Sequence, residues 1–110
     1  YRQALAPLEE KGVLVMPERA HNAHMFYLAC RSLDERSALI EYLKGQGIAS
    51  VFHYLSLHKS QYFADKHDGR VLPHADRFTD CLLRLPMFAE LGAAGAERVA
   101  TAVLDFYSTR

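Results

Sequence analysis

Histidine and tyrosine side chains gather at the end of one predicted strand. Residues 51–54 alternate as a strand does and bring His53 and Tyr54 to its end, and His58 follows in the polar stretch beyond. Imidazole and phenol groups can donate hydrogen bonds to phosphate or sugar hydroxyls, so a ligand of that kind could lie here. The alternative is that His53 and Tyr54 only complete the strand, and residue types alone do not decide between the two.

The six histidines do not form a metal-binding pattern. His21 and His24 are three residues apart in a predicted turn, no pair has the four-residue spacing of a helical zinc site, and no Cys-x-x-Cys is present. We therefore expect no native metal site. The other histidines are His53, His58, His67 and His74.

The two cysteines, Cys30 and Cys81, both have apolar neighbours. This setting predicts buried, reduced thiols, because nothing in the local sequence would lower a thiol pKa. A disulfide between them is the alternative, and it would need Cα atoms within about 7 Å. Glycine-rich phosphate loops and Gly-x-Ser-x-Gly turns are also absent, so no catalytic residue is predicted in the chain.

Composition narrows the classes of partner. Thirteen basic and thirteen acidic residues give a net charge of zero, which predicts neither a nucleic acid nor an anionic membrane as a partner. No apolar run approaches the roughly 20 residues that cross a bilayer. The first residues show no signal peptide and no initiator methionine, so we expect a domain cut from a longer, cytoplasmic protein.

Capping signals and periodicity predict the elements that position the strand end. Ser32 and Glu35 form a capping box for a helix that Gly47 ends. The continuous apolar run 24–30 suits a strand that is covered on both faces or lies in the middle of a sheet. The full order is a helix at 1–11, strands at 13–17 and 24–30, a helix at 32–47, a strand at 48–54, a polar loop at 55–75 with room for a short helix at 58–66, a helix at 75–82, a strand at 83–86 and a helix at 94–107. It predicts an α+β fold, a small and mostly antiparallel sheet with helices on one face.

Four stretches have the order and spacing of one enzyme family. They are residues 22–28, 36–44, 53–58 and 83–88. Together they resemble the C-terminal part of the DegT/DnrJ/EryC1/StrS sugar aminotransferases over nearly the whole chain. One departure is Ser56, which stands where the family pattern His-Tyr-x-Pro-Leu-His has proline. Serine frees the backbone φ angle and restores an N–H donor at this point of the loop.

The resemblance implies a fold and a function that composition could not. Residues 1–110 would be the C-terminal small domain of a fold type I pyridoxal phosphate enzyme, with a large cofactor-binding domain upstream and a second subunit completing a homodimer. Such enzymes move an amino group from L-glutamate to a keto sugar nucleotide. Within the family, the resemblance points to TDP-4-keto-6-deoxy sugars and to the synthesis of lipopolysaccharide and enterobacterial common antigen. The isolated domain would bind no cofactor and would be inactive.

The resemblance also gives roles to particular residues. His53, Tyr54 and His58 would approach the sugar nucleotide, and Asn22 and His24 would lie at the small-domain edge of the cleft. The lysine that holds the cofactor would lie upstream, because the four lysines of this chain fall at predicted helix ends or in the polar loop. They are Lys11, Lys44, Lys59 and Lys66.

Two alternatives to this function remain. The chain could be a free-standing binding or interaction domain that keeps the fold without the chemistry. It could also belong to a relative that acts on another keto sugar, or to a dehydratase in which the lysine is replaced. An upstream reading frame for a cofactor domain would separate the first alternative from the enzyme.

Overall fold

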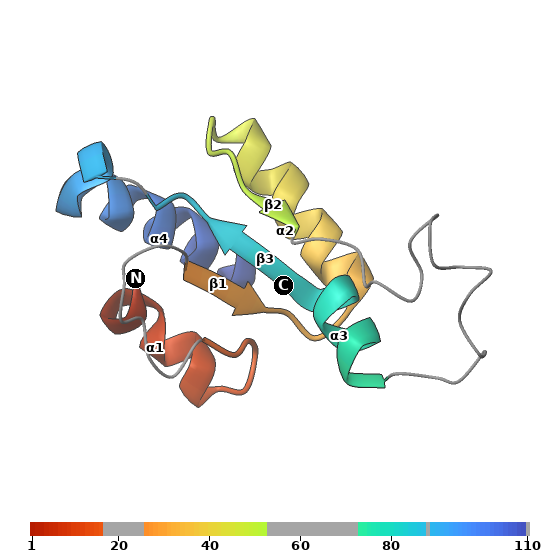
Figure 1. The fold of residues 1–110 in the computed structure, drawn as a ribbon. Helices are drawn as coiled ribbons and strands as arrows, with labels where there is room; N and C mark the ends of the chain where they lie inside the picture. The colour runs from red at the N-terminus through yellow and green to blue at the C-terminus, as the bar shows by residue number, and fades with distance from the viewer. Residues whose placement is uncertain (17–25, 53–72, 88, 110) are drawn as a thin grey trace.

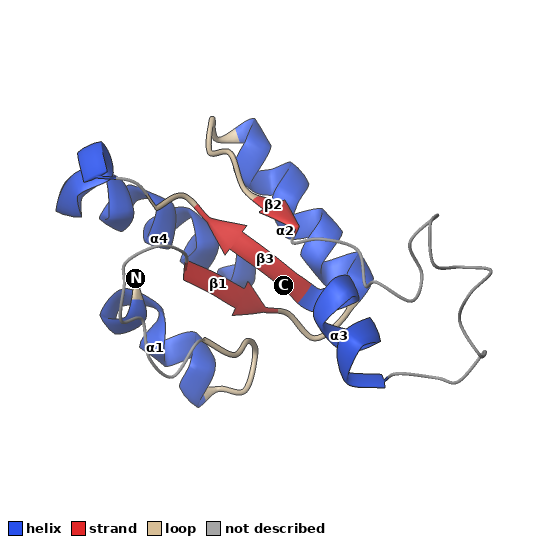
Figure 2. Cartoon of the chain, in the orientation of Figure 1, coloured by secondary structure: helices blue, strands red, loops and turns tan. Residues whose placement is uncertain are grey.

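A three-stranded antiparallel sheet organises the molecule (Figure 1). The computed structural model describes residues 1–16, 26–52, 73–87 and 89–109. Strand β3 (Leu82–Leu85) lies in the middle, between β1 (Phe26–Ala29) and β2 (Val51–Phe52). In Figure 2, helices α2 and α4 cross behind the strands. The predicted α+β class, with helices on one face of a small antiparallel sheet, is confirmed.

The strand register separates a core face from an open face. Phe26 pairs with Leu85, and Leu28 pairs with Leu83, so these four side chains share one face of the sheet. All four are buried in a single hydrophobic cluster with residues of three helices. The helical members of that cluster are Leu5 and Leu8 of α1, Leu39 and Leu43 of α2, and Val99, Ala100, Ala102, Val103, Phe106 and Tyr107 of α4.

Helix α2 (Leu33–Gly45) begins where the sequence predicts. The Ser32 hydroxyl accepts a hydrogen bond from the Glu35 N–H at 3.1 Å, which satisfies one of the free donors of the first turn. The Glu35 side chain does not complete the capping box, because it turns to Arg31 instead. Gly47 follows the helix with φ of 76°, a conformation that glycine adopts without strain.

The predicted strand at 13–17 is wrong within the described residues. It is reduced to one antiparallel bridge, in which Val15 and Ala29 exchange backbone hydrogen bonds. The neighbouring donors are used elsewhere: the Val13 N–H bonds the Leu8 carbonyl, and the Met16 N–H bonds the Glu9 carboxylate at 3.0 Å. A ladder cannot extend through donors that already have partners.

Strands β1 and β2 also differ from expectation. The run 24–30 suits a strand that is covered on both faces or lies in the middle of a sheet. Three of the four β1 residues are buried, but β1 lies at an edge of the ladder and β3 lies in the middle. Strand β2 contains two residues where the sequence predicts a strand at 48–54, whose last two residues lie outside the described ranges. The predicted loop at 55–75 and the short helix at 58–66 lie mostly or wholly outside those ranges too.

The remaining helices follow the predicted pattern with shifted ends. Helix α1 (Arg2–Glu10) ends before Gly12, whose φ is 71°. Helix α3 (Pro73–Cys81) begins two residues early, with proline at its first position. A 3₁₀ turn, η2 (Ala89–Leu91), leads into α4 (Gly92–Ser108). Within the described ranges, no helix combines the length and apolar character that crossing a bilayer requires.

Candidate functional site

All five predicted substrate-binding residues lie outside the described residues. Asn22 and His24 precede β1, and the other three follow β2 directly in the sequence. The structure does describe the strand that precedes that second group in the sequence. Phe52 is the last residue of β2, and the peptide bond after it leads to His53. The three predicted residues after β2 are His53, Tyr54 and His58.

The end of β2 is an exposed edge of the sheet. Val51 pairs with Arg84 and Phe52 pairs with Leu83, so among the described residues β2 pairs with β3 alone. The side chains of Val51 and Phe52 are 47% and 48% exposed. The two described residues of this strand form few backbone hydrogen bonds, so side-chain contacts contribute to holding them in place.

A buried arginine contacts the end of β2. Arg36 of α2 is 9% exposed, and its guanidinium lies over the Phe52 ring, 5.3 Å from the ring centre. Its Nη1 donates to the Thr79 carbonyl oxygen of α3 at 2.7 Å. Its Nε is buried and finds no hydrogen-bond partner among the described residues. One side chain therefore joins three elements: α2, β2 and α3.

The opposite face of the sheet carries a second arginine. Tyr27 pairs with Arg84, which pairs with Val51, so the three side chains form a row on the face away from the core. Tyr27 and Arg84 are half-buried, and the Arg84 Nε has no partner among the described residues. The two arginines lie on opposite faces, because Phe52 and Val51 point to opposite sides of the strand.

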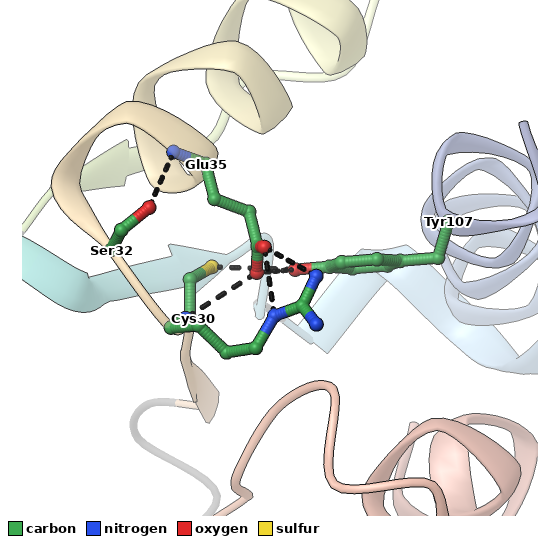
Figure 3. A network of polar contacts seen from close by, with 5 residues as sticks. Cys30, Ser32, Glu35 and Tyr107 are labelled. Atoms are coloured by element: carbon green, nitrogen blue, oxygen red, sulfur yellow. Dashed lines mark hydrogen bonds and ion pairs between the residues drawn. The ribbon is translucent and has the colours of Figure 1, made fainter. Parts of the chain in front are cut away.

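A buried polar network joins the start of α2 to the end of α4 (Figure 3). Glu35 is 6% exposed and accepts from Tyr107 Oη at 2.9 Å and from the Arg31 backbone N–H at 3.3 Å. The Arg31 guanidinium adds two bonds to the other carboxylate oxygen, from Nε at 3.0 Å and Nη2 at 2.7 Å. Tyr107 Oη also lies 3.6 Å from the Cys30 sulfur. The carboxylate thus has four donors, as a buried charge requires.

The thiol and phenol groups in and beside this network stay protonated. Burial raises the pKa of the Cys30 thiol to about 11, and burial also raises the pKa of Cys81. Burial, with the contacts to Cys30 and Glu35, raises the pKa of Tyr107 far above its ordinary value. Both cysteines are free and buried, as the sequence predicts, and a protonated buried thiol is a poor nucleophile. The network is therefore structural rather than catalytic.

The charge of Glu35 should make stability depend on pH. Burial alone would raise the pKa of Glu35, but hydrogen bonds from Arg31 and Tyr107 outweigh it and hold the pKa below its ordinary value. A depressed folded-state pKa stabilises the fold above the unfolded value of about 4.3, and this contribution is lost as pH falls through the folded pKa.

Urea unfolding of the wild type and of Glu35→Gln measures this dependence. The stability difference between them should be constant above about pH 5 and shrink as pH falls toward 3. A difference that stays constant, or that grows in acid, would contradict the assignment of a charged Glu35 to the folded state.

Two hollows lie around Arg98, at the other end of α2 from Arg36. Their volumes are about 420 and 460 Å³, and both include Ile48 and Arg98 in their walls. Arg98 Nη2 donates to the Gln46 carbonyl oxygen at 2.6 Å. Glu97 and Asp105 line the first hollow, and the second is mostly apolar. The described residues in their walls include no histidine, cysteine or lysine.

The described residues offer little to a metal or to a covalently held cofactor. Among them, no group of three or more His, Cys, Asp or Glu side chains lies close enough to hold a metal ion. Lys11 and Lys44 are exposed at the ends of α1 and α2, and the other two lysines lie outside the described ranges. A lysine that forms a Schiff base is usually desolvated or flanked by another cation, which an exposed helix end does not provide.

A comparison with known protein families shows which family the chain belongs to. The sequence model of the DegT/DnrJ/EryC1/StrS aminotransferase family matches residues 1–104 of the 110. The chain belongs to this family.

Solved structures show the same fold in larger proteins. NtdA from Bacillus subtilis, solved with the cofactor PMP, superposes with a TM-score of 0.82 at 23% identity, over 96% of this chain and 26% of its own. DesV from S. venezuelae, in complex with a ketimine intermediate, gives 0.77 at 27% identity, over 94% and 29%. TlmJ from Streptoalloteichus hindustanus gives 0.82 at 21% identity, over 99% and 29%. The chain spans less than a third of the length of each.

The structure of this DegT/DnrJ/EryC1/StrS family member shows contacts that the sequence does not predict. Arg36 falls inside the family-like stretch 36–44, but its contacts to Phe52 and Thr79 cross 16 and 43 positions of sequence, and no local pattern signals them. Arg31 and Glu35 form an ion pair at 2.7 Å, although Arg31 precedes the Ser32 cap and lies outside α2, so helical spacing does not predict the pair.

Proposed function

We propose that this chain is the C-terminal small domain of a pyridoxal phosphate-dependent sugar-nucleotide aminotransferase. The longer protein transfers an amino group from L-glutamate to a TDP-4-keto-6-deoxy sugar, in the synthesis of a cell-surface polysaccharide such as lipopolysaccharide or enterobacterial common antigen. It acts in the cytoplasm as a homodimer, with a large domain that precedes residue 1.

The observation that carries the proposal is the family match over residues 1–104, in a chain that spans under a third of its structural relatives. A domain that matches a family over almost its whole length, yet forms so small a share of the relatives' chains, fits one part of a larger enzyme. The PMP of NtdA and the ketimine of DesV support pyridoxal phosphate chemistry for the longer protein.

The contribution proposed for this domain is a wall of the substrate site. His53 and Tyr54 follow Phe52 in the sequence, and Arg36 contacts Phe52. With His58 they would donate hydrogen bonds to the sugar nucleotide. Asn22 and His24, which precede β1, would line the edge of the same cleft. These donors bind and orient the substrate and carry no covalent step.

The described residues do not fit the attachment of pyridoxal phosphate. Lys11 and Lys44 are exposed at helix ends, and the buried Tyr107 hydroxyl is already hydrogen-bonded to Cys30 and to Glu35. Pyridoxal phosphate supplies the electron sink for moving the amino group when it is bound. The proposal therefore places its binding in the large domain.

The test uses the longer protein that carries this domain. It is incubated with pyridoxal phosphate, L-glutamate and a TDP-4-keto-6-deoxy sugar, and the aminated sugar nucleotide is measured by mass spectrometry. Product supports the proposal. If the protein binds the cofactor but forms no product, pyridoxal phosphate stays as the proposed cofactor and the proposed substrate is wrong. A protein that binds no cofactor favours the alternative of a non-catalytic binding domain.

Substitution of His53 and Tyr54 tests the wall itself. His53→Ala and Tyr54→Phe should each lower kcat/KM for the sugar nucleotide by about tenfold or more, because each removes one hydrogen bond to the substrate. Conversion of the cofactor by L-glutamate alone should be unchanged. His74→Ala, an exposed histidine of α3, is the matched control. Equal values for wild type and both variants would remove these residues from the site.

A further inference from the structure

We infer that Arg36 is a positioning residue for the substrate wall, because it joins the strand that precedes residues 53–72 to the helix that follows them. This inference rests on the proposed function. Residues 53–72 lie outside the described residues; in the sequence they stand between Phe52, the last residue of β2, and Pro73, the first residue of α3. Arg36 contacts an element on each side of that segment.

The contact on the first side is with the aromatic ring of Phe52. The guanidinium lies over the ring face at 5.3 Å, the arrangement in which a cation is attracted to the ring quadrupole. Phe52 is about half exposed, and among the described residues its contacts are with Arg36 and, through the ladder, with Leu83. Because His53 is bonded directly to Phe52, any change in the strand end is passed to the wall residues.

The contact on the second side is with the end of α3. The Thr79 carbonyl lies in the last turn of α3, where carbonyl oxygens lack partners within the helix. Arg36 Nη1 satisfies it at 2.7 Å and places a positive charge at the negative end of the helix dipole. The Thr79 hydroxyl is used separately, since it donates to the Ala75 carbonyl at 2.9 Å.

Burial indicates that this geometry is held closely. Arg36 is 9% exposed, and arginine is seldom buried so far unless it is paired. The nearest acidic residue on its helix, Glu35, already has four donors from Arg31 and Tyr107. Two contacts of Arg36 are shown, with an aromatic ring and with a carbonyl, and they belong to the strand before residues 53–72 and to the helix after them.

The experiment compares Arg36→Met, Arg36→Lys and Phe52→Leu in the longer protein. Arg36→Met should raise KM for the TDP-4-keto-6-deoxy sugar about tenfold, because the wall loses a charged hydrogen bond and the ring contact that hold its frame. The KM for L-glutamate and the rate at which L-glutamate converts the cofactor should stay within about twofold of wild type. Arg36→Lys should recover part of the loss, and Phe52→Leu should raise the same KM about threefold.

Arg98→Met is the matched control, because it removes an equally short arginine–carbonyl bond at the far end of α2. If the wild-type enzyme aminates the sugar and the KM for the sugar is unchanged in both Arg36→Met and Phe52→Leu, the positioning role of Arg36 is overturned. The proposed function is then left intact. Equal losses in the glutamate and sugar reactions also overturn the positioning role, because they indicate a general structural role. If Arg36→Met does not fold, Arg36→Lys and Phe52→Leu decide by the same criterion. A wild type that aminates no sugar overturns the proposed function instead.

Discussion

Glu35→Ala should lower the free energy of unfolding of the domain by about 3 kcal/mol, because it removes the acceptor from a buried network. The Tyr107 hydroxyl would lose a bond of 2.9 Å in a buried position, and the Arg31 backbone N–H would lose its acceptor. The Arg31 guanidinium is more than half exposed, so water can replace the carboxylate there. Most of the cost therefore comes from the tyrosine side. Equilibrium urea unfolding measures it.

Glu41→Ala is the matched control for this prediction. Glu41 lies on the same helix and is exposed, so its removal should change stability by no more than about 0.5 kcal/mol. A cycle with Tyr107→Phe tests the mechanism: alone it should cost about 1–2 kcal/mol, and together with Glu35→Ala it should cost less than the sum. Additive losses would show that Glu35 and Tyr107 do not act through their hydrogen bond.

The parts of the fold that the sequence predicts correctly depend on short-range signals. The Ser32 cap requires a hydroxyl three residues before a helical N–H, and Gly12 and Gly47 supply positive φ after α1 and α2. Each signal lies within a turn of the boundary it marks. The buried stripe of α4 is of the same kind, because Val99 and Val103 recur at the helical period.

The wrong predictions concern competition between distant groups. An apolar run at 13–17 has the composition of a strand, but the Glu9 carboxylate takes the Met16 N–H and only Val15 pairs with β1. The central position of β3 was not predicted either, since four residues after a helix give no sign of their two neighbours. The composition of a segment shows whether it could form a strand, whereas its pairing depends on which hydrogen-bond partners the fold brings to it.

The residues of the candidate site also differ in whether the sequence predicts them. His53, Tyr54 and His58 could be predicted because their types and order along one segment suggest a ligand, and they remain predictions because they lie outside the described residues. Arg36 could not be predicted, because its role is defined by Phe52 and Thr79, which only the folded chain brings to it. Residues that touch a substrate can leave a local pattern, whereas residues that hold them in place often leave none.

Leu83→Ala should lower the free energy of unfolding by about 3–4 kcal/mol, since it opens a cavity in the central strand. Leu83 is fully buried and pairs with Leu28 on one side and with Phe52 on the other, so its loss loosens the core and the strand that carries the wall together. Domains of this size are stable by only about 5–15 kcal/mol, so the change should shift the urea midpoint strongly without changing the slope. Leu33→Ala, which removes a half-exposed leucine from α2, should cost no more than about 0.5 kcal/mol. Similar losses for the two leucines would mean that the sheet does not form the core, and that β3 does not support the end of β2.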